Sequence, residues 1–203
     1  MDPLIQMSTK INVKWDAILR SNKLNKFTIS NEWNENVALL RLFPTITAKT
    51  VRSFLQPPIR GVVLQTYGAG NGPSKRDDII RELRLACSRG VIILNISQCH
   101  SGSVSGAYAA GAMLGAAGVI RGADMTAEAA LAKLSYVLAL DDLTKQQQHD
   151  LMKTNLRGEL TQPDISQLSL SNSKFLKGTN KTRSIDDYIK RTNLTPIHQH
   201  PLN

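Results

Sequence analysis

The sequence predicts an α/β fold, a small, doubly wound parallel sheet of about four strands with flanking helices. Short apolar runs alternate with longer amphipathic segments through the middle of the chain. The segments between the runs are long enough for the crossover connections that parallel strands need. Apolar residues make up 41% of the 203 residues and aromatic residues 5%, so aliphatic side chains must fill most of the core.

The first strands and helices are expected between residues 37 and 89. Residues 37–42 form the first strand-like run, and residues 47–55 follow with apolar side chains at helical spacing. The proline pair at 57–58 ends that helix. Gly61–Thr66 is the second strand, and residues 74–89 form an amphipathic helix that Gly90 terminates.

The remaining elements are expected between residues 91 and 155. Residues 91–96 begin with four apolar residues in a row, as in a strand that is covered on both faces. Small residues then predict a helix that packs closely on the sheet. The elements expected here are a strand at 91–96, a helix within 106–118, a short strand at 119–120, a helix at 125–140 with Thr126 near its start, and a helix at 143–155.

This pattern divides the chain into three parts. Residues 1–36 are polar and linker-like, with Trp15 and Trp33 as isolated apolar anchors. Residues 37–161 form the α/β domain. Residues 162–203 are polar without a sustained period, and we expect most of them to be disordered.

The charge distribution argues against a nucleic-acid partner. The net charge is +9, but residues 61–170 carry ten basic and ten acidic residues, so the excess lies in the flanks. Nucleic-acid binding usually requires a basic face on the folded domain. No stretch is apolar enough to span a membrane, and no secretory signal is visible. The two cysteines form no disulfide framework, which favours a reducing, cytoplasmic location.

The loop after the second strand, Tyr-Gly-Ala-Gly-Asn-Gly-Pro at residues 67–73, is the first candidate site. It is similar to a dinucleotide-binding turn, but Pro73 stands where the third glycine belongs and no carboxylate ends the next strand. Asn71 is the distinctive residue, since its amide has donors and an acceptor between two glycines. It is either an ordinary turn residue or a binding residue.

The loop after the third strand contains cysteine, histidine and serine at residues 97–103. Cys99 and His100 are adjacent, so in an extended segment their side chains point to opposite sides, whereas a nucleophile and its base must face each other. Val104 stands where the serine of a G-x-S-x-G elbow belongs. We therefore expect a structural thiol and no catalytic residue.

The remaining acidic and histidine residues have simpler explanations than catalysis or metal binding. Asp124 and Glu128 lie at a helix start, where acidic residues more often interact with the helix dipole. His198 and His200 have no further ligands nearby, and two histidines do not make a metal site. We predict neither a metal nor a cofactor.

Several long segments, in order, resemble the C-terminal domain of type I L-asparaginases. They cover about residues 37–161, and the nearest likeness is to the animal cytoplasmic enzymes, some of which are also named 60-kDa lysophospholipase. The segments are LLRLFPTITAKTVRSFLQPPIRGVVLQTYGAGNGP, NISQCHSGSVSGAYAAG, GVIRGADMTAEAALAKLSYVL and NLRGELT.

The resemblance implies roles for three residues. In the family, the asparagine of the G-x-G-N loop reaches the active site of a neighbouring subunit, and Asn71 stands in that position. In bacterial type I enzymes, a cysteine and an arginine help to bind an allosteric asparagine. Cys99 matches the cysteine, but Gln65 stands in place of the arginine, so a bidentate carboxylate clamp is absent. An effector site of the bacterial kind is therefore doubtful.

The family's catalytic threonines lie in an N-terminal domain with a T-G-G-T segment, and this sequence has no such segment. The resemblance therefore implies an L-asparaginase half that completes a neighbouring active site, in a homo-oligomer or with a full-length asparaginase chain, and is inactive alone. The alternative is a noncatalytic module that binds a small amino acid or an asparaginase chain. A lysophospholipase has only the family name behind it.

Overall fold

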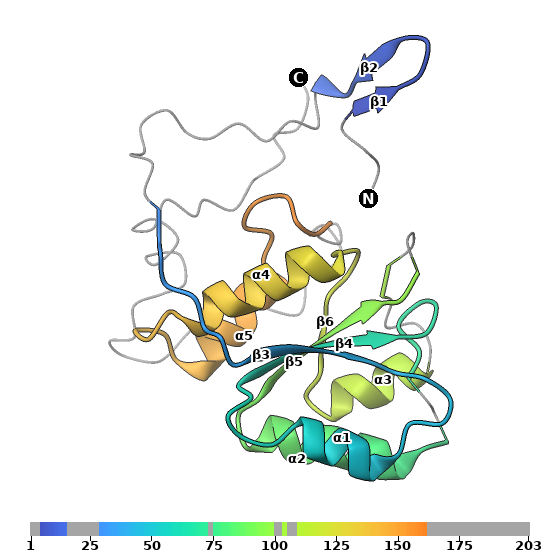
Figure 1. Cartoon of the computed structure of the whole chain (residues 1–203), viewed down its shortest axis with the longest axis vertical. Coiled ribbons are helices and arrows are strands. Elements are labelled where there is room, and N and C mark those ends of the chain that lie inside the picture. Colours follow the sequence, from blue (N-terminus) through green and yellow to red (C-terminus); the bar gives the residue numbers. More distant parts are fainter. Residues whose placement is uncertain (1–4, 16–28, 73–74, 100–102, 105–108, 162–203) are drawn as a thin grey trace, which may run out of the picture.

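The computed structural model describes residues 5–15, 29–72, 75–99, 103–104 and 109–161. Its centre is a parallel sheet in the order β3-β4-β5-β6, with helices on both faces (Figure 1). This confirms the predicted α/β class. The strands are β3 (Val37–Arg41), β4 (Gly61–Thr66), β5 (Ile92–Ser97) and β6 (Ile120–Arg121). The helices are α1 (Ala48–Phe54), α2 (Asp77–Ser88), α3 (Ala109–Ala116), α4 (Ala127–Leu138) and α5 (Lys145–Lys153).

The strand order follows the chain without reversal, so the three crossover helices lie on one face of the sheet. We call this side, with α1, α2 and α3, the crossover face. The opposite side, with α4 and α5, is the return face (Figure 1). Each face of the sheet has its own hydrophobic core, and successive residues of the central strands point to opposite faces. Val62 and Leu64 pack on the crossover face, whereas Val63 packs on the return face.

Local capping explains where several helices begin and end. Thr47, Thr126 and Thr144 precede α1, α4 and α5, and each side chain accepts the N–H of the residue three positions later. Gly90 follows α2 with a φ of 92°, which permits the left-handed turn expected from the sequence. Helix α2 begins at Asp77, later than the predicted start at residue 74, and its first turn carries two aspartates.

The first 36 residues contain an element that the sequence analysis missed. Strands β1 (Ile5–Met7) and β2 (Ile11–Val13) form an antiparallel pair. The expectation that Trp15 and Trp33 act as apolar anchors is wrong, because their side chains are 65% and 57% exposed. Polar contacts hold Asn34 against α4 instead: Asn34 Nδ2 donates to the Leu138 carbonyl, and Ser135 Oγ donates to the Asn34 carbonyl.

Two further expectations concern the C-terminal residues and membrane-spanning helices. The predicted disorder of residues 162–203 lies outside the described residues. In the part of the chain that the structure describes, no helix has the length and apolar character needed to cross a bilayer.

Candidate functional site

The loops after β4 and β5 meet at the carboxyl edge of the sheet. The two strands are parallel and in register to their ends, where Thr66 is paired with Ser97. The strand arrows in Figure 1 point to the same side, and the loop after β4 projects there. In open α/β sheets this edge is where ligands bind. Both loops that the sequence singles out as candidate sites begin at this edge.

The loop of residues 67–72 is a tight turn closed by Tyr67 and Asn71. Tyr67 N donates to the Asn71 carbonyl at 3.0 Å, and Asn71 N donates to the Tyr67 carbonyl at 2.8 Å. Gly70 has a φ of 93°, and a Cβ there would lie 2.5 Å from Val104 Cγ1. Glycine is therefore required at position 70 for both its backbone conformation and its close packing.

Side chains at the end of the sheet hold this loop in place. Asn95 Nδ2 donates to the Gly70 carbonyl at 3.1 Å, while Asn95 Oδ1 accepts from Thr66 Oγ1 at 2.6 Å. Asn95 and Thr66 are both buried. Ser97 Oγ donates to the Gly68 carbonyl at 2.6 Å. The bonds of Asn95 are shielded from water and the Ser97 bond is exposed, and together they hold the loop against the end of β5.

Sequence reasoning did not identify Asn95 and Ser97 as supports of the site. The signal was present, because a buried strand of isoleucine and leucine is interrupted by an asparagine and ends in a serine. A buried amide requires partners for its hydrogen-bonding groups, and the neighbouring loop has free carbonyls to supply one. Which loop would lie above β5, however, was not visible without the fold.

The structure places the three predicted residues at this edge. Asn71 is partly buried, and within the described residues its side-chain amide forms no hydrogen bond. Gln65 lies near the end of β4, and its carbonyl accepts from Leu42 N and from Gln98 Nε2. Cys99 is exposed just beyond β5, and its N–H donates to Ser97 Oγ at 2.9 Å.

In the described parts of the two loops, residues 67–72 and 97–99, the side chains available for recognition are uncharged. The described loops offer amides, hydroxyls, backbone groups and the Cys99 thiol, while His100 lies outside the described residues. Among the described residues no cluster of histidine, cysteine or carboxylate side chains could hold a metal ion. The second thiol, Cys87, lies on α2, and burial raises its pKa to about 11. Protonation makes it a poor nucleophile.

Asp124 has a different role from the dipole interaction expected from the sequence. Its carboxylate accepts the Thr161 N–H and the Thr161 hydroxyl, both at 2.7 Å. Burial raises the pKa of Asp124, but these hydrogen bonds outweigh it, so the pKa lies below its usual value. Asp124 therefore ties the end of the domain to the start of α4.

Comparison with known proteins gives a consistent picture. The family model "Glutaminase/Asparaginase C-terminal domain" matches residues 36–152. The chain is 50% identical over 161 residues to an L-asparaginase of Dirofilaria immitis, an alignment covering 79% of this chain and 27% of that protein. It is 43% identical over 165 residues to the human 60 kDa lysophospholipase, covering 81% and 29% respectively. The chain thus spans under a third of the length of these relatives.

Solved structures agree with the fold. The chain superimposes on L-asparaginase I of Vibrio cholerae with a TM-score of 0.71 and 34% identity. That superposition covers 79% of this chain and 48% of the bacterial chain. The thermostable L-asparaginase of Thermococcus kodakarensis gives a TM-score of 0.63 with 25% identity.

Proposed function

Because the chain belongs to the glutaminase/asparaginase C-terminal domain family, we propose that it takes part in the hydrolysis of L-asparagine to L-aspartate and ammonia. Its role would be that of a C-terminal domain that extends Asn71 into the active site of a neighbouring subunit. The observation that carries this proposal is the rigid glycine loop, which is bonded to β5 while the Asn71 amide forms no hydrogen bond within the described residues.

The geometry supports a binding role for Asn71 more strongly than an ordinary turn role. A turn asparagine usually satisfies its amide within its own loop. Here the backbone of Tyr67 closes the turn, and Asn95 satisfies the Gly70 carbonyl. The Asn71 amide therefore remains available to accept from and donate to a substrate.

The nucleophile must come from elsewhere in the assembly. The printed sequence contains no T-G-G-T segment, and the carboxyl edge shows no paired nucleophile and base in its described part. Nucleophilic catalysis needs such a pair within hydrogen-bonding reach. We infer that the 203-residue chain alone does not release ammonia from L-asparagine.

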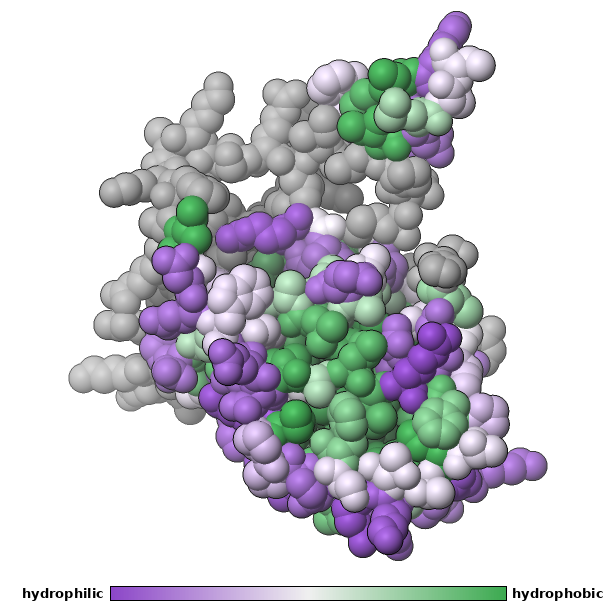
Figure 2. Space-filling model, in the orientation of Figure 1, coloured by the Kyte–Doolittle hydropathy of each residue, from purple (hydrophilic) through white to green (hydrophobic). Residues whose placement is uncertain are grey.

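An apolar surface supports contact with another asparaginase chain. Strand β3 is an edge of the sheet, and Figure 2 shows an apolar area on this side of the molecule, bordered by hydrophilic residues. Leu39 and Phe43 are 40% and 48% exposed. Exposed apolar patches with polar borders commonly mark protein contacts. The free thiols of Cys87 and Cys99 fit a reducing, cytoplasmic setting for this assembly.

A domain exchange tests the proposal. The matching segment of the D. immitis L-asparaginase is replaced with residues 36–161 of this chain, and ammonia release from L-asparagine is measured. We expect an active chimera, in which Asn71→Ala lowers kcat/KM by roughly tenfold or more, the loss of one hydrogen bond to a charged substrate. The control is Gln146→Ala, which removes an exposed amide on α5 and should leave activity unchanged.

Two outcomes would contradict the proposal. A folded, oligomeric chimera without activity would favour the alternative, a noncatalytic module that binds a small amino acid or an asparaginase chain. Equal kcat/KM for the Asn71→Ala and Gln146→Ala chimeras would remove the role of Asn71. The same chimera also tests the hypothesis of a lysophospholipase, which requires cleavage of a lysophospholipid.

A further inference from the structure

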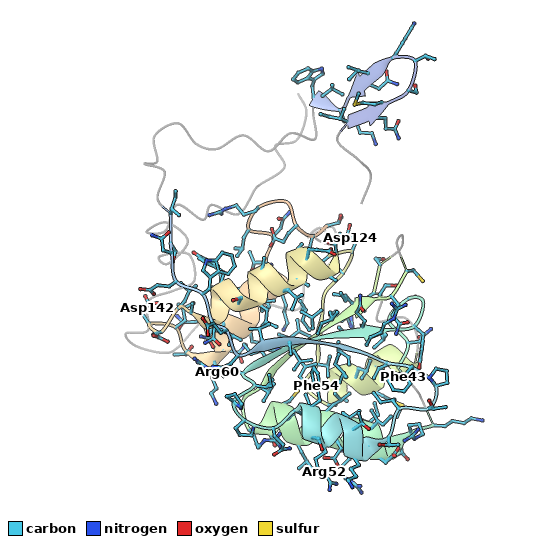
Figure 3. The ribbon with its side chains drawn as sticks, viewed as in Figure 1. Phe43, Arg52, Phe54, Arg60, Asp124 and Asp142 are labelled. Carbon is cyan, nitrogen blue, oxygen red and sulfur yellow. The ribbon has the colours of Figure 1, made fainter. Side chains whose placement is uncertain are left out.

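A second concave site lies at the edge of the sheet opposite the glycine loop, where β4 and β5 begin. The pocket has a volume of about 320 Å³. This is at the lower end of the range for small-molecule sites, roughly 300 Å³ and above. Figure 3 labels Arg60 at this edge of the sheet, next to the start of β4.

Three basic side chains from three separate segments line the pocket. Arg60 precedes β4, Arg89 follows α2, and Lys145 is the first residue of α5. Asp141 is the one carboxylate in the lining, so the formal charge of the lining is +2. Residues 61–170 as a whole carry equal numbers of basic and acidic side chains. Arg60 lies just before that range, and the fold brings it together with Arg89 and Lys145 around one pocket.

Two of the cations are positioned by the structure. One terminal nitrogen of Arg89, Nη2, donates to the Leu55 carbonyl at 2.9 Å, which fixes the side chain. The Arg89 charge also lowers the pKa of Glu82, so only part of this guanidinium is left for a ligand. Lys145 lies directly against Gly90, and a Cβ on Gly90 would collide with its Nζ. Gly90 also has a φ of 92°. A glycine therefore makes room for the ammonium group in the pocket wall.

The polar floor of the pocket is fixed as well. Gln148 is 5% exposed, and its Nε2 donates to the carbonyls of Val137 and Leu140, each at 3.3 Å. These bonds hold the connection between α4 and α5, which carries Asp141. A pocket with a fixed floor loses less conformational freedom when a ligand binds than a cluster of mobile surface lysines would.

We propose that this pocket binds a small oxyanion, a phosphate or a dicarboxylate, between Arg60, Arg89 and Lys145. Guanidinium groups bind both carboxylate and phosphate oxygens with charge-assisted hydrogen bonds, and the lysine adds a third positive contact. Asp141 opposes binding, because its charge repels the ligand. The site lies away from the glycine loop and does not depend on the function proposed for Asn71.

Calorimetric titration of the 203-residue chain with sodium phosphate and, separately, sodium succinate tests this site. Ionic strength is held constant with sodium chloride. We expect saturable binding of at least one anion. Lys145→Gln and Arg60→Gln should each raise Kd by about tenfold, as expected for one charge-assisted hydrogen bond. Asp141→Asn should lower Kd. Lys49→Gln, the same charge change on α1, is the matched control and should leave Kd unchanged.

The comparison of anions and variants decides the outcome. Tighter phosphate binding identifies a phosphate site, and tighter succinate binding a dicarboxylate site. The proposal is overturned if neither anion binds saturably to the folded chain, or if Lys145→Gln and Lys49→Gln have the same Kd as the unaltered chain. Circular dichroism of each variant separates loss of binding from loss of fold.

Discussion

The crossover face and the return face of the sheet each carry an ion pair, and the two pairs differ in how far the cation is buried. On the crossover face, Arg52 of α1 binds Glu82 of α2 with two hydrogen bonds of 3.0 and 2.7 Å, and the Arg52 side chain is 58% exposed. On the return face, Lys133 of α4 pairs with Glu159 at 2.6 Å, and the two side chains are 4% and 12% exposed. In the first pair an exposed arginine meets a carboxylate, Glu82, that is 4% exposed, whereas in the second pair both partners are buried.

The buried pair persists because other groups complete its hydrogen bonding. Glu159 accepts the N–H groups of Leu156 and Arg157, and Lys133 donates to the Thr154 carbonyl. Burial lowers the pKa of Lys133. Burial raises the pKa of Glu159, but the Lys133 ammonium and the Leu156 N–H outweigh it, and the pKa lies below its usual value. A buried cation such as Lys133 therefore depends on each of its partners. An exposed cation such as Arg52 can be solvated by water when its partner is lost.

Breaking the buried pair should have the largest effect. In Glu159→Gln, the Lys133 ammonium keeps its burial but loses its counter-ion, so we expect the free energy of unfolding to fall by about 3 kcal/mol. Urea unfolding of the full chain measures this. The double variant Lys133→Met with Glu159→Gln should lose less than the single one, because no buried charge remains. A single variant as stable as the unaltered chain would contradict this account.

Breaking the pair on the crossover face should cost less. Arg52 is mostly exposed, and Arg81 Nε remains 3.9 Å from the Glu82 carboxylate. We expect Arg52→Gln to lower the free energy of unfolding by about 1 kcal/mol. The same urea titration gives the value. A loss equal to that of Glu159→Gln would mean that exposure does not distinguish the two faces.

Acid should weaken the return face through Glu159. Its pKa is lowered on folding, so it contributes stability above its unfolded pKa, near 4.3, and this is lost as the pH falls through the lower, folded value. The pKa of Glu82 is also lowered, and that of Asp78 is lowered to about 2, so both contribute in the same direction. The urea midpoint should therefore be level near pH 6 and fall below about pH 4.3. Glu159→Gln should reduce this slope, and an unchanged slope would exclude Glu159 as its source.

Thiol labelling should show the smallest effect, and it tests how tightly α2 packs on the crossover face. Cys87 packs against that core with a pKa of about 11, whereas Cys99 is exposed. Treatment with iodoacetamide at neutral pH, followed by mass spectrometry, should label Cys99 quickly and Cys87 only after urea is added. Rapid labelling of both thiols in the native chain would show that α2 separates readily from the sheet.

The sequence predicts the central strands well, because a run of consecutive apolar residues indicates a strand that is buried on both faces. Gly61–Thr66 has the bounds expected of it, and the run that became β5 is shifted by one residue at each end. The helix start at Asp77 was missed because the residue before it, Arg76, makes no capping bond, so no capping residue marks the boundary. Hairpin β1–β2 was missed because its side chains are mostly exposed and show no burial pattern.

The candidate site was predictable in its composition but not in its assembly. Glycines around Asn71 identify a special turn, since residue type alone indicates backbone conformation. The bond from Asn95 to Gly70 joins positions 25 apart in the chain, and the pocket beside Arg60 joins three segments. Such contacts depend on strand order and register, which periodicity does not encode.

The order β3-β4-β5-β6 has a consequence for how the chain acquires its fold during synthesis. When each strand after β3 is synthesised, the neighbouring strand with which it pairs has already been synthesised. Helices α1, α2 and α3 lie between these strands in the chain, so they can cover the crossover face at the same time. The return face must wait for α4 and α5, which are translated after all four strands. A nascent chain that has just completed Ile120–Arg121 therefore has one sealed face and one bare apolar face, whose strand residues include Val63, Leu94 and Ile96. Until α4 and α5 cover those residues, the unfinished domain exposes an apolar face that is prone to aggregation.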